Sequence, residues 1–154
     1  MIKINTIINN KNWERYLVNP NKFVEKRIIN LNKEFKLYKK NKIYCTLLLS
    51  GDAEIKRLNK KFRKKNKTTD VLSFPFYEKS KLKNKFKNEK EVYLGDIIIN
   101  LSKIKNKKNK KKFILEFNKL WVHGLVHLFG YNHIKIKEFK KMKKIEKKFL
   151  FYIN

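Results

Sequence analysis

The sequence predicts a single domain of the α/β (α+β) class, in which a small mixed β-sheet of about four strands packs against helices. The chain has 154 residues, a length that suits one domain with one apolar core. Short apolar runs typical of strands are interspersed with longer runs of helical periodicity. No internal repeat, Gly/Ser linker or shift in composition divides the chain, so residues 1–154 are expected to form that one domain.

The first half of the chain predicts two strands, each followed by a helix. The predicted elements are a strand over residues 1–9, a helix from residue 20 to about 38, a strand over 42–50 and a helix over 52–62. Asn19 and Pro20 place a capping residue before a proline at the first helical position. After the second strand, Asp52 is expected to be the N-cap of the second helix.

The second half predicts two more strands and two more helices. The predicted segments are a strand over 70–75, a solvated lysine-rich loop or hairpin arm over 79–90, a strand over 92–100, a basic segment over 103–112, and helices over 113–129 and 135–149. Pro75 marks the end of the third strand, because proline cannot donate a hydrogen bond to a sheet. Gly130 is expected to end the helix before it.

The formal net charge of +28 is extreme for a chain of this length. A field of this sign concentrates polyanions such as RNA, DNA or an anionic membrane surface. Only four of the 41 basic residues are arginine, while Lys, Asn and Ile are abundant, as an AT-rich genome would also produce. The composition leaves open whether the charge serves to bind polyanions or reflects the codon usage of an AT-rich genome. Nucleic acid is the partner class that fits the charge best.

Cysteine content and hydropathy bear on the compartment. Cys45 is the only cysteine, so no disulfide forms within the chain and a reducing compartment is compatible. The amino terminus lacks the long apolar centre of a signal peptide, and no segment reaches the roughly 20 apolar residues of a membrane span. We therefore expect a cytoplasmic protein that is not inserted in a membrane.

The three histidines of the chain, His123, His127 and His133, are grouped in one short segment. His123 and His127 are four residues apart, so a helix places them on one face with Cβ atoms about 5–6 Å apart. Gly130 can adopt a left-handed conformation, end the helix and turn the chain so that His133 returns to the same point. Three neutral imidazoles with a fourth position left to water are typical of a catalytic zinc site. The sequence therefore predicts one divalent metal ion held by these three residues, with zinc favoured over other divalent metals.

The histidine spacing also matches the zinc-binding frame of metzincin proteases. Those enzymes carry a glutamate, their general base, directly after the first histidine. This chain has Gly124 at that position. A zinc-bound water would lack its proton acceptor, so a metalloprotease is the least favoured function.

The segment from His123 to His133 resembles the motif of the bacterial YbeY family of metal-dependent endoribonucleases, His-Gly-x-x-His-Leu-x-Gly-Tyr-Asp-His. Two further blocks agree with the family. One family segment has an arginine, a short spacer and then the sequence Thr-Asp-Val-Leu-Ser-Phe-Pro, and residues 58–63 and 69–75 resemble it. Residues 94–99 resemble the family's Leu-Gly-Asp-Ile strand. Met142 and Glu146 fit its final helix. The resemblance covers residues 45–150, and the N-terminal third matches only in pattern.

This resemblance implies a zinc-dependent, single-strand-preferring endoribonuclease. It implies a role in rRNA processing, notably maturation of the 3′ end of small-subunit rRNA, and in ribosome quality control, with precursor rRNA and the ribosome as cytoplasmic partners. It carries over the three histidines as metal ligands and Arg63 as the basic residue of the catalytic cleft. Asn132 stands where the family usually has aspartate, and Lys64 stands where glycine commonly follows the arginine.

The hypothetical mechanism combines the metal with the arginine. Zinc lowers the pKa of water and polarises a phosphoryl oxygen, and Arg63 offers planar, permanently charged donors to the phosphate. Either water or the RNA 2′-hydroxyl attacks, and the sequence leaves both open. The alternative function is a non-catalytic, metal-stabilised rRNA-binding or ribosome assembly factor.

Several other residues near the motifs are weaker candidates. Asp70 and Asp96 are expected to brace strands rather than take part in catalysis, and Ser73 is a further candidate beside the cleft. The aromatic residues Trp121, Phe129 and Tyr131 are expected to pack in the core rather than stack on bases.

Overall fold

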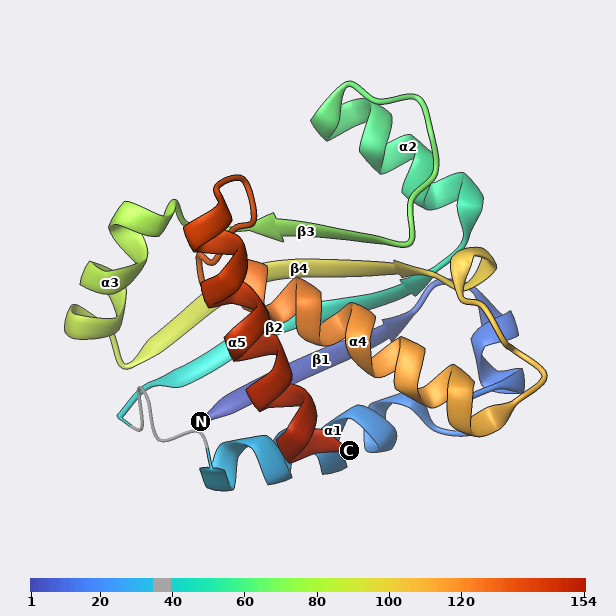
Figure 1. The fold of residues 1–154 in the computed structure, drawn as a ribbon, viewed down its shortest axis with the longest axis horizontal. Helices are drawn as coiled ribbons and strands as arrows, with labels where there is room; N and C mark the ends of the chain where they lie inside the picture. Colours follow the sequence, from blue (N-terminus) through green and yellow to red (C-terminus); the bar gives the residue numbers. More distant parts are fainter. Residues whose placement is uncertain (35–39) are drawn as a thin grey trace.

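Within residues 1–34 and 40–154, which the computed structural model describes, four strands form one mixed sheet (Figure 1). The strands are β1 (Ile2–Ile8), β2 (Lys42–Ser50), β3 (Val71–Pro75) and β4 (Glu91–Asn100), in the spatial order β1-β2-β4-β3. Strands β1, β2 and β4 run parallel, and β3 is antiparallel to β4 at one edge. The predicted fold class, a mixed sheet packed with helices, is confirmed.

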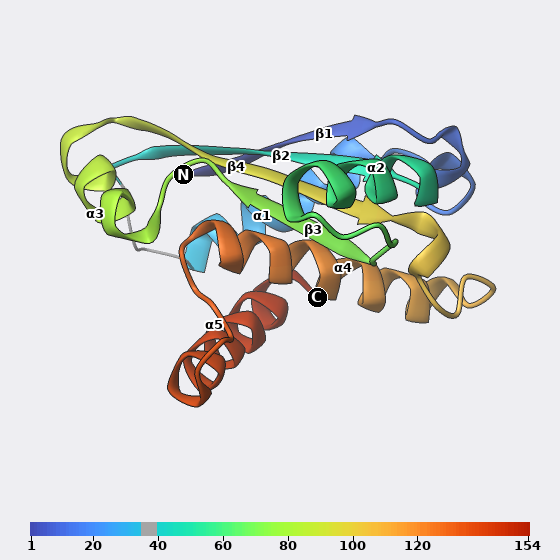
Figure 2. The same cartoon turned by 90° about the horizontal axis from the view of Figure 1, so that it is seen from above.

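The helices of the described chain lie on both faces of the sheet, with two layers of helices on one of them. They are α1 (Pro20–Glu34), α2 (Asp52–Arg63), α3 (Lys79–Asn88), α4 (Lys110–Leu128) and α5 (Ile136–Ile153), with short 3-10 helices at Lys11–Arg15 and Leu101–Lys103. Helix α1 packs on β1, and α4 packs on β3 and β4. Helix α5 contacts both α1 and α4 from the outside, as Figure 2 shows for α4. This arrangement places the end of α4 between the sheet and α5.

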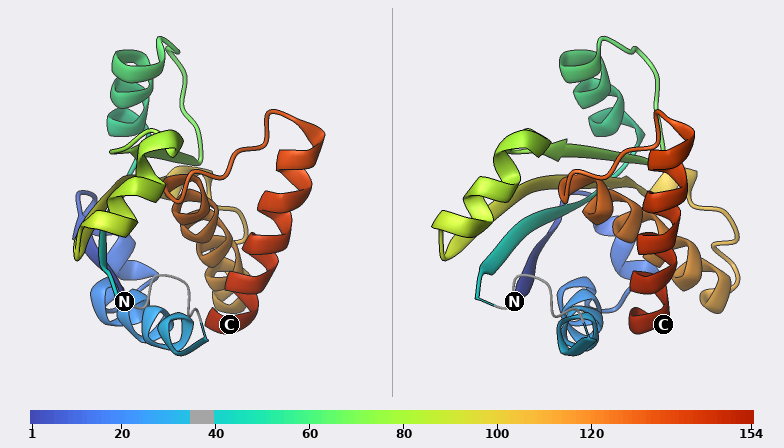
Figure 3. Two further views of the ribbon diagram at one scale, coloured as in Figure 1. Left: turned by 90° about the vertical axis from the view of Figure 1, so that its left-hand side faces the viewer. Right: turned by 60° about the vertical axis from the view of Figure 1, so that its left-hand side comes forward.

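The two faces of the sheet carry separate apolar clusters, because successive residues of a strand point to opposite faces. On β4, Ile97 and Ile99 join the large core shared with α1, α4 and α5. Ile98 instead joins a small cluster with Ile55 of α2 and Leu72 of β3. Helix α2 therefore belongs to the opposite face and stands out beside β3 (Figure 3).

The prediction of a solvated loop or hairpin arm over residues 79–90 is wrong, because this segment contains helix α3. Lysine is a good helix former, and Leu82 and Phe86 lie four residues apart on one buried face. The Phe86 ring stacks on Phe129, with centroids 6.2 Å apart. This contact anchors α3 beside the end of α4.

Two helices differ from the prediction at their ends. Helix α4 begins at Lys110 rather than at residue 113, because the side chain of Asn109 accepts a hydrogen bond from the Lys112 N–H and caps it. Helix α5 begins one residue later than predicted and continues to Ile153. Of the predicted first helix, residues 35–38 lie outside the described residues.

The prediction of Asp52 as an N-cap is also wrong. Gly51 occupies the N-cap position of α2, and Asp52 is its first helical residue. The Asp52 carboxylate instead accepts a hydrogen bond from the side chain of Asn100 at the end of β4, at 2.8 Å. This bond joins the start of α2 to the sheet.

Cys45 lies in the large core, where burial raises the pKa of its thiol to about 12. The thiol is therefore protonated and unreactive at neutral pH. None of the described helices combines the length and the apolar character needed to cross a membrane.

Candidate metal centre

Three histidine side chains converge at the carboxyl-terminal end of α4. One ring nitrogen from each of His123, His127 and His133 lies within 4.8 Å of the other two. His123 and His127 are half-buried, and His133 is exposed. The structure thus brings together the three residues that the spacing predicted would meet.

Helix α4 and the turn after it place these side chains. Gly130 has a φ of +83°, a left-handed conformation that glycine adopts without strain. Its N–H donates to the carbonyl of His127 at 2.8 Å, and the Tyr131 N–H donates to the carbonyl of Val126 at 3.3 Å. This is the Schellman pattern that ends a helix and reverses the chain. The reversal brings His133 back toward the helix, as predicted.

Hydrogen bonds orient the rings of both helical histidines. The Nδ1 atom of His123 lies 2.6 Å from Oε1 of Glu146, and Nδ1 of His127 lies 2.9 Å from the carbonyl oxygen of Tyr131. A carboxylate and a carbonyl only accept, so each Nδ1 carries a proton, and in a neutral ring the lone pair is then on Nε2. The two Nε2 atoms are 3.1 Å apart. Two lone pairs at this distance repel each other unless a cation lies against both.

The protonation state of the site also suits a metal. Burial, followed by repulsion from His123, lowers the pKa of His127 to about 4. The imidazole is therefore neutral at pH 7, the form that binds a metal. Imidazole nitrogens suit zinc, copper, iron and nickel, and a Nδ1–H bonded to a carboxylate or a backbone carbonyl is typical of metal-bound histidine. The described residues thus fit a divalent transition metal.

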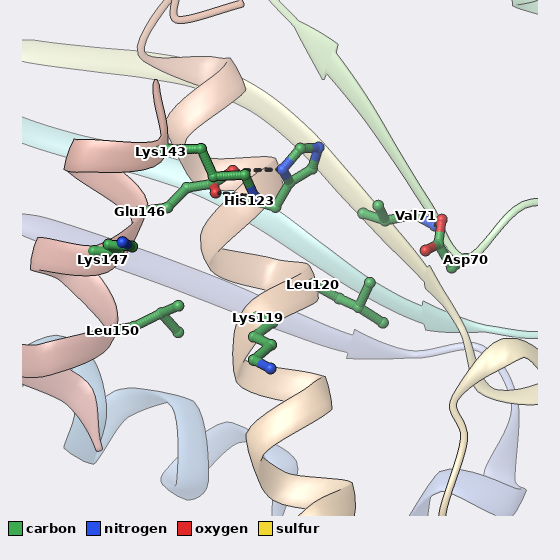
Figure 4. A pocket seen from close by; sticks show the side chains of 9 residues that line it. All are labelled: Asp70, Val71, Lys119, Leu120, His123, Lys143, Glu146, Lys147 and Leu150. Carbon is green, nitrogen blue, oxygen red and sulfur yellow. Dashed lines mark hydrogen bonds and ion pairs between the residues drawn. The ribbon is translucent and has the colours of Figure 1, made fainter. Parts of the chain in front are cut away.

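Glu146 of α5 is the one buried carboxylate beside these histidines within the described chain (Figure 4). Burial raises the pKa of its carboxyl group, but hydrogen bonds from Lys143 and His123 outweigh burial, so the pKa lies below its usual value. The carboxylate is therefore ionised and accepts from both neighbours, at 2.9 Å from Lys143 Nζ and 2.6 Å from His123 Nδ1. Sequence reasoning placed Glu146 in the final helix of the family but missed this contact, because it joins residues 23 positions apart.

Replacing Glu146 with alanine is expected to weaken metal binding about 10- to 100-fold, because the His123 ring loses the acceptor that orients it. Glu146→Gln is expected to retain most of the affinity, since its amide oxygen still accepts from Nδ1. Titration of the metal-free proteins with Zn²⁺ against a competing chelator measures both affinities. Equal affinity of the alanine variant and the native chain would show that this contact does not support the site.

Gly124 has a packing role next to the first histidine. A Cβ atom built on Gly124 would lie 2.6 Å from Cγ2 of Ile97 and 3.2 Å from Oγ of Ser73. Ile97 is fully buried and branched at Cβ, so it cannot move aside easily. Helix α4 therefore packs directly on β3 and β4 at this point, and the position that carries the general base in metzincin proteases has no room for a side chain.

The substitution Gly124→Glu is expected to lower the free energy of unfolding by roughly 3 kcal/mol or more, since it forces a carboxylate into the core. Urea unfolding monitored by circular dichroism measures the loss. Leu115→Glu, on an exposed part of the same helix, is the control and is expected to cost far less. A stable Gly124→Glu variant that hydrolyses peptides would contradict this account.

Arg63, the predicted basic residue of the cleft, is the last residue of α2. Its guanidinium donates to the carbonyl of Ser73 at 3.2 Å and lies 5.9 Å from the ring centre of Phe74. The side chain of Ser73 faces Gly124 of α4. The hydrogen bond therefore joins Arg63 to β3, the strand that packs against the histidine helix. Arg63 does not line either of the two hollows that reach His123 and His127. Arg63 as a whole is exposed to solvent.

The two residues that depart from the family motif both lie in turns. Lys64 has a φ of +58° and forms the left-handed cap of α2, the conformation that glycine adopts most easily. The Oδ1 atom of Asn132 accepts from the N–H of His133 at 2.8 Å, a bond that aspartate can also form. Lys64 thus belongs to the turn after α2, and Asn132 to the turn that leads to His133.

The weaker candidates fall in different places. Asp70 caps the start of β3 by accepting from the Val71 N–H at 2.8 Å, and it also lines the hollow beside His123. Asp96 accepts from the Tyr93 hydroxyl at 2.6 Å and lines a hollow with residues of α2, on the face of the sheet away from α4. Trp121 is fully buried, which confirms packing as its role.

Comparisons with known proteins agree with this architecture. A family model described as Endoribonuclease YbeY matches residues 7–154, which extends the resemblance into the N-terminal third. Endoribonuclease YbeY of Pelagibacter ubique is 43% identical over 150 residues, covering 95% of this chain and 92% of that protein. Endoribonuclease YbeY of Wolbachia sp. subsp. Drosophila simulans is 34% identical over 154 residues, covering 97% and 93%.

A solved structure has the same fold. The solution structure of a protein from Thermotoga maritima superimposes with a TM-score of 0.61 at 26% identity, and the match covers 99% of this chain and 89% of that one. The family model matches nearly the whole sequence, and the relatives match over most of their own length. The chain belongs to the endoribonuclease YbeY family.

Proposed function

We propose that this chain is a metal-dependent endoribonuclease that cleaves single-stranded RNA, with zinc held by His123, His127 and His133. The strongest support is the pair of facing Nε2 atoms, 3.1 Å apart, in rings that are each held at Nδ1 by an acceptor. Membership of a family of endoribonucleases supports RNA as the substrate. The net charge of +28 supports a polyanionic substrate.

The proposed roles of the residues follow from their contacts. A bound zinc ion would supply Lewis acidity toward a phosphoryl oxygen and toward water. Glu146 and the Tyr131 carbonyl hold the imidazoles of His123 and His127 in the tautomer that binds metal. Arg63 has free guanidinium N–H groups that can donate to a phosphate and stabilise the charge that develops during cleavage.

We further propose precursor rRNA as the cellular substrate, with residues 1–154 acting as one catalytic domain in the cytoplasm. The expected processes are maturation of the 3′ end of small-subunit rRNA and ribosome quality control. The support is the resemblance of three separate sequence blocks, which hold the histidines, Arg63 and the strand around Asp96, to the corresponding family blocks.

The experiment that tests the activity compares three substrates of one sequence: single-stranded RNA, the same RNA in a duplex, and single-stranded DNA, each labelled at the 5′ end. Internal cleavage of the single-stranded RNA is expected with Zn²⁺ and not with excess chelator. Equal cleavage with and without chelator would contradict metal dependence, and absence of cleavage under all conditions would contradict the enzyme.

A non-catalytic rRNA-binding or assembly factor is the second candidate, because a charge of +28 favours RNA binding whether or not cleavage follows. In that case the metal would only stiffen the turn after α4. Variants of Arg63 separate the two functions, as described in the Discussion.

A further inference from the structure

Two hollows flank the histidine cluster. The first, here called the α4–α5 hollow, has a volume of about 430 Å³, is bounded by β3, α4 and α5, and includes His123 (Figure 4). The second has a volume of about 440 Å³ and includes His127 and the turn after α4. Both volumes lie in the range of roughly 300–1,000 Å³ that is usual for sites of small ligands. An RNA strand that crosses the histidine cluster would therefore have one hollow beside His123 and another beside His127.

The two hollows differ in charge. The α4–α5 hollow is lined by three lysines, Lys119, Lys143 and Lys147, and two carboxylates, Asp70 and Glu146. The second hollow is lined by one lysine and two carboxylates, and its lysine, Lys79, already lies 4.0 Å from the carboxylate of Glu138. Of the two, the α4–α5 hollow is the one suited to an anion.

Two of the three lysines in the α4–α5 hollow are available to a ligand. Lys143 is engaged with Glu146, which also accepts from His123. Lys119 of α4 and Lys147 of α5 are exposed, and neither has a hydrogen-bond or ion-pair partner among the described residues. These two ammonium groups are therefore the unpaired positive charges of the lining, which also includes the Asp70 carboxylate.

The same hollow has an apolar side. Val71 of β3, Leu120 of α4 and Leu150 of α5 are half-buried and complete its lining (Figure 4). Apolar side chains suit the flat, weakly polar face of a nucleobase, while the ammonium groups suit the phosphate joined to it. One nucleotide therefore combines both chemical properties of the lining.

We propose that the α4–α5 hollow is a nucleotide subsite for single-stranded RNA, in which Lys119 and Lys147 bind the phosphate next to the one that is cleaved. Val71, Leu120 and Leu150 contact its base. The subsite rests on the proposed function, because it takes the histidine cluster as the point of cleavage. These apolar side chains make no base-specific hydrogen bonds, so the subsite is expected to accept any base.

The test uses two double variants with the same loss of charge. Lys119→Ala/Lys147→Ala removes the free amines of the hollow, and Lys111→Ala/Lys144→Ala removes two exposed lysines from the same helices outside it. Cleavage of a short single-stranded RNA is measured at about 0.15 M salt, where long-range charge effects are largely screened. The hollow variant is expected to raise KM about tenfold with little change in kcat, and the control pair is expected to leave KM within about twofold.

A binding measurement separates this proposal from the proposed function. With chelator present, fluorescence anisotropy follows binding of the same RNA at several salt concentrations. The slope of log Kd against log salt is expected to fall by about 0.7 in the hollow variant and much less in the control, since the two lysines bind one phosphate and each neutralised phosphate on a single strand contributes about 0.7. Equal KM and equal slopes in the two variants would overturn the subsite. If the native protein binds but does not cleave, the proposed function fails while the slopes still test the subsite.

Discussion

Replacing His127 with alanine is expected to reduce RNA cleavage by about a thousandfold or more. A metal ion supplies several kcal/mol of transition-state stabilisation, and about 4 kcal/mol corresponds to this factor. His127 is the central residue of the cluster, because its Nε2 faces that of His123 and its Nδ1 is held by the turn that carries His133. The measurement is the single-turnover rate on labelled single-stranded RNA.

Metal removal from the native protein is the matched control for this variant. Chelation is expected to produce a loss of the same size that added Zn²⁺ reverses, whereas the His127→Ala variant is expected not to recover. Circular dichroism checks that both remain folded. Full activity in a folded His127→Ala variant would show that the cleavage does not depend on this site or comes from a contaminating nuclease.

Replacing Arg63 with alanine is expected to lower kcat about 100- to 1,000-fold with little change in RNA affinity, as is usual when one donor to a developing charge is removed. The side chain is exposed and makes a single hydrogen bond, to Ser73, so the fold should not change. Arg63→Lys is expected to recover only part of the rate, because an ammonium group cannot donate in the planar, two-pronged geometry of a guanidinium. Rates and binding are measured on the same RNA.

Arg57 of the same helix is the matched control. It is exposed and paired with Glu54 at 2.7 Å, and Arg57→Ala removes the same charge. Its kcat is expected to change by less than about twofold. If Arg63→Ala retains full cleavage, the arginine is not part of the catalytic machinery. If it supports normal rRNA maturation in cells although cleavage is lost, the non-catalytic assembly factor becomes the better description.

The histidine cluster was predictable from sequence because it is encoded locally. A four-residue spacing on a helix and a glycine at the turn determine where His123, His127 and His133 meet, and the helix packing only supports this geometry. The order of strands and long helices was predictable for the same reason, since each has its own apolar period. These features need no knowledge of distant contacts.

Features that depend on tertiary packing were not predictable. Helix α3 was not predicted because its only apolar residues, Leu82 and Phe86, are surrounded by lysines. These two residues are buried because α3 packs beside the end of α4, a contact that the local sequence does not indicate. The contact of Glu146 with His123 requires α5 to cross α4. The sequence shows that the protease glutamate is absent at position 124. It does not show that a side chain there would clash with Ile97, because that contact depends on the packing of α4 on the sheet.

The most direct test of the metal centre combines elemental analysis with X-ray absorption spectroscopy on purified native protein and the His127→Ala variant. We expect one zinc ion per native chain, with about three nitrogen ligands at roughly 2.0–2.1 Å, and its loss in the variant. Absence of a stoichiometric metal in the native protein after loading with Zn²⁺, or a metal without histidine ligands, would contradict the assignment of His123, His127 and His133 as the metal centre.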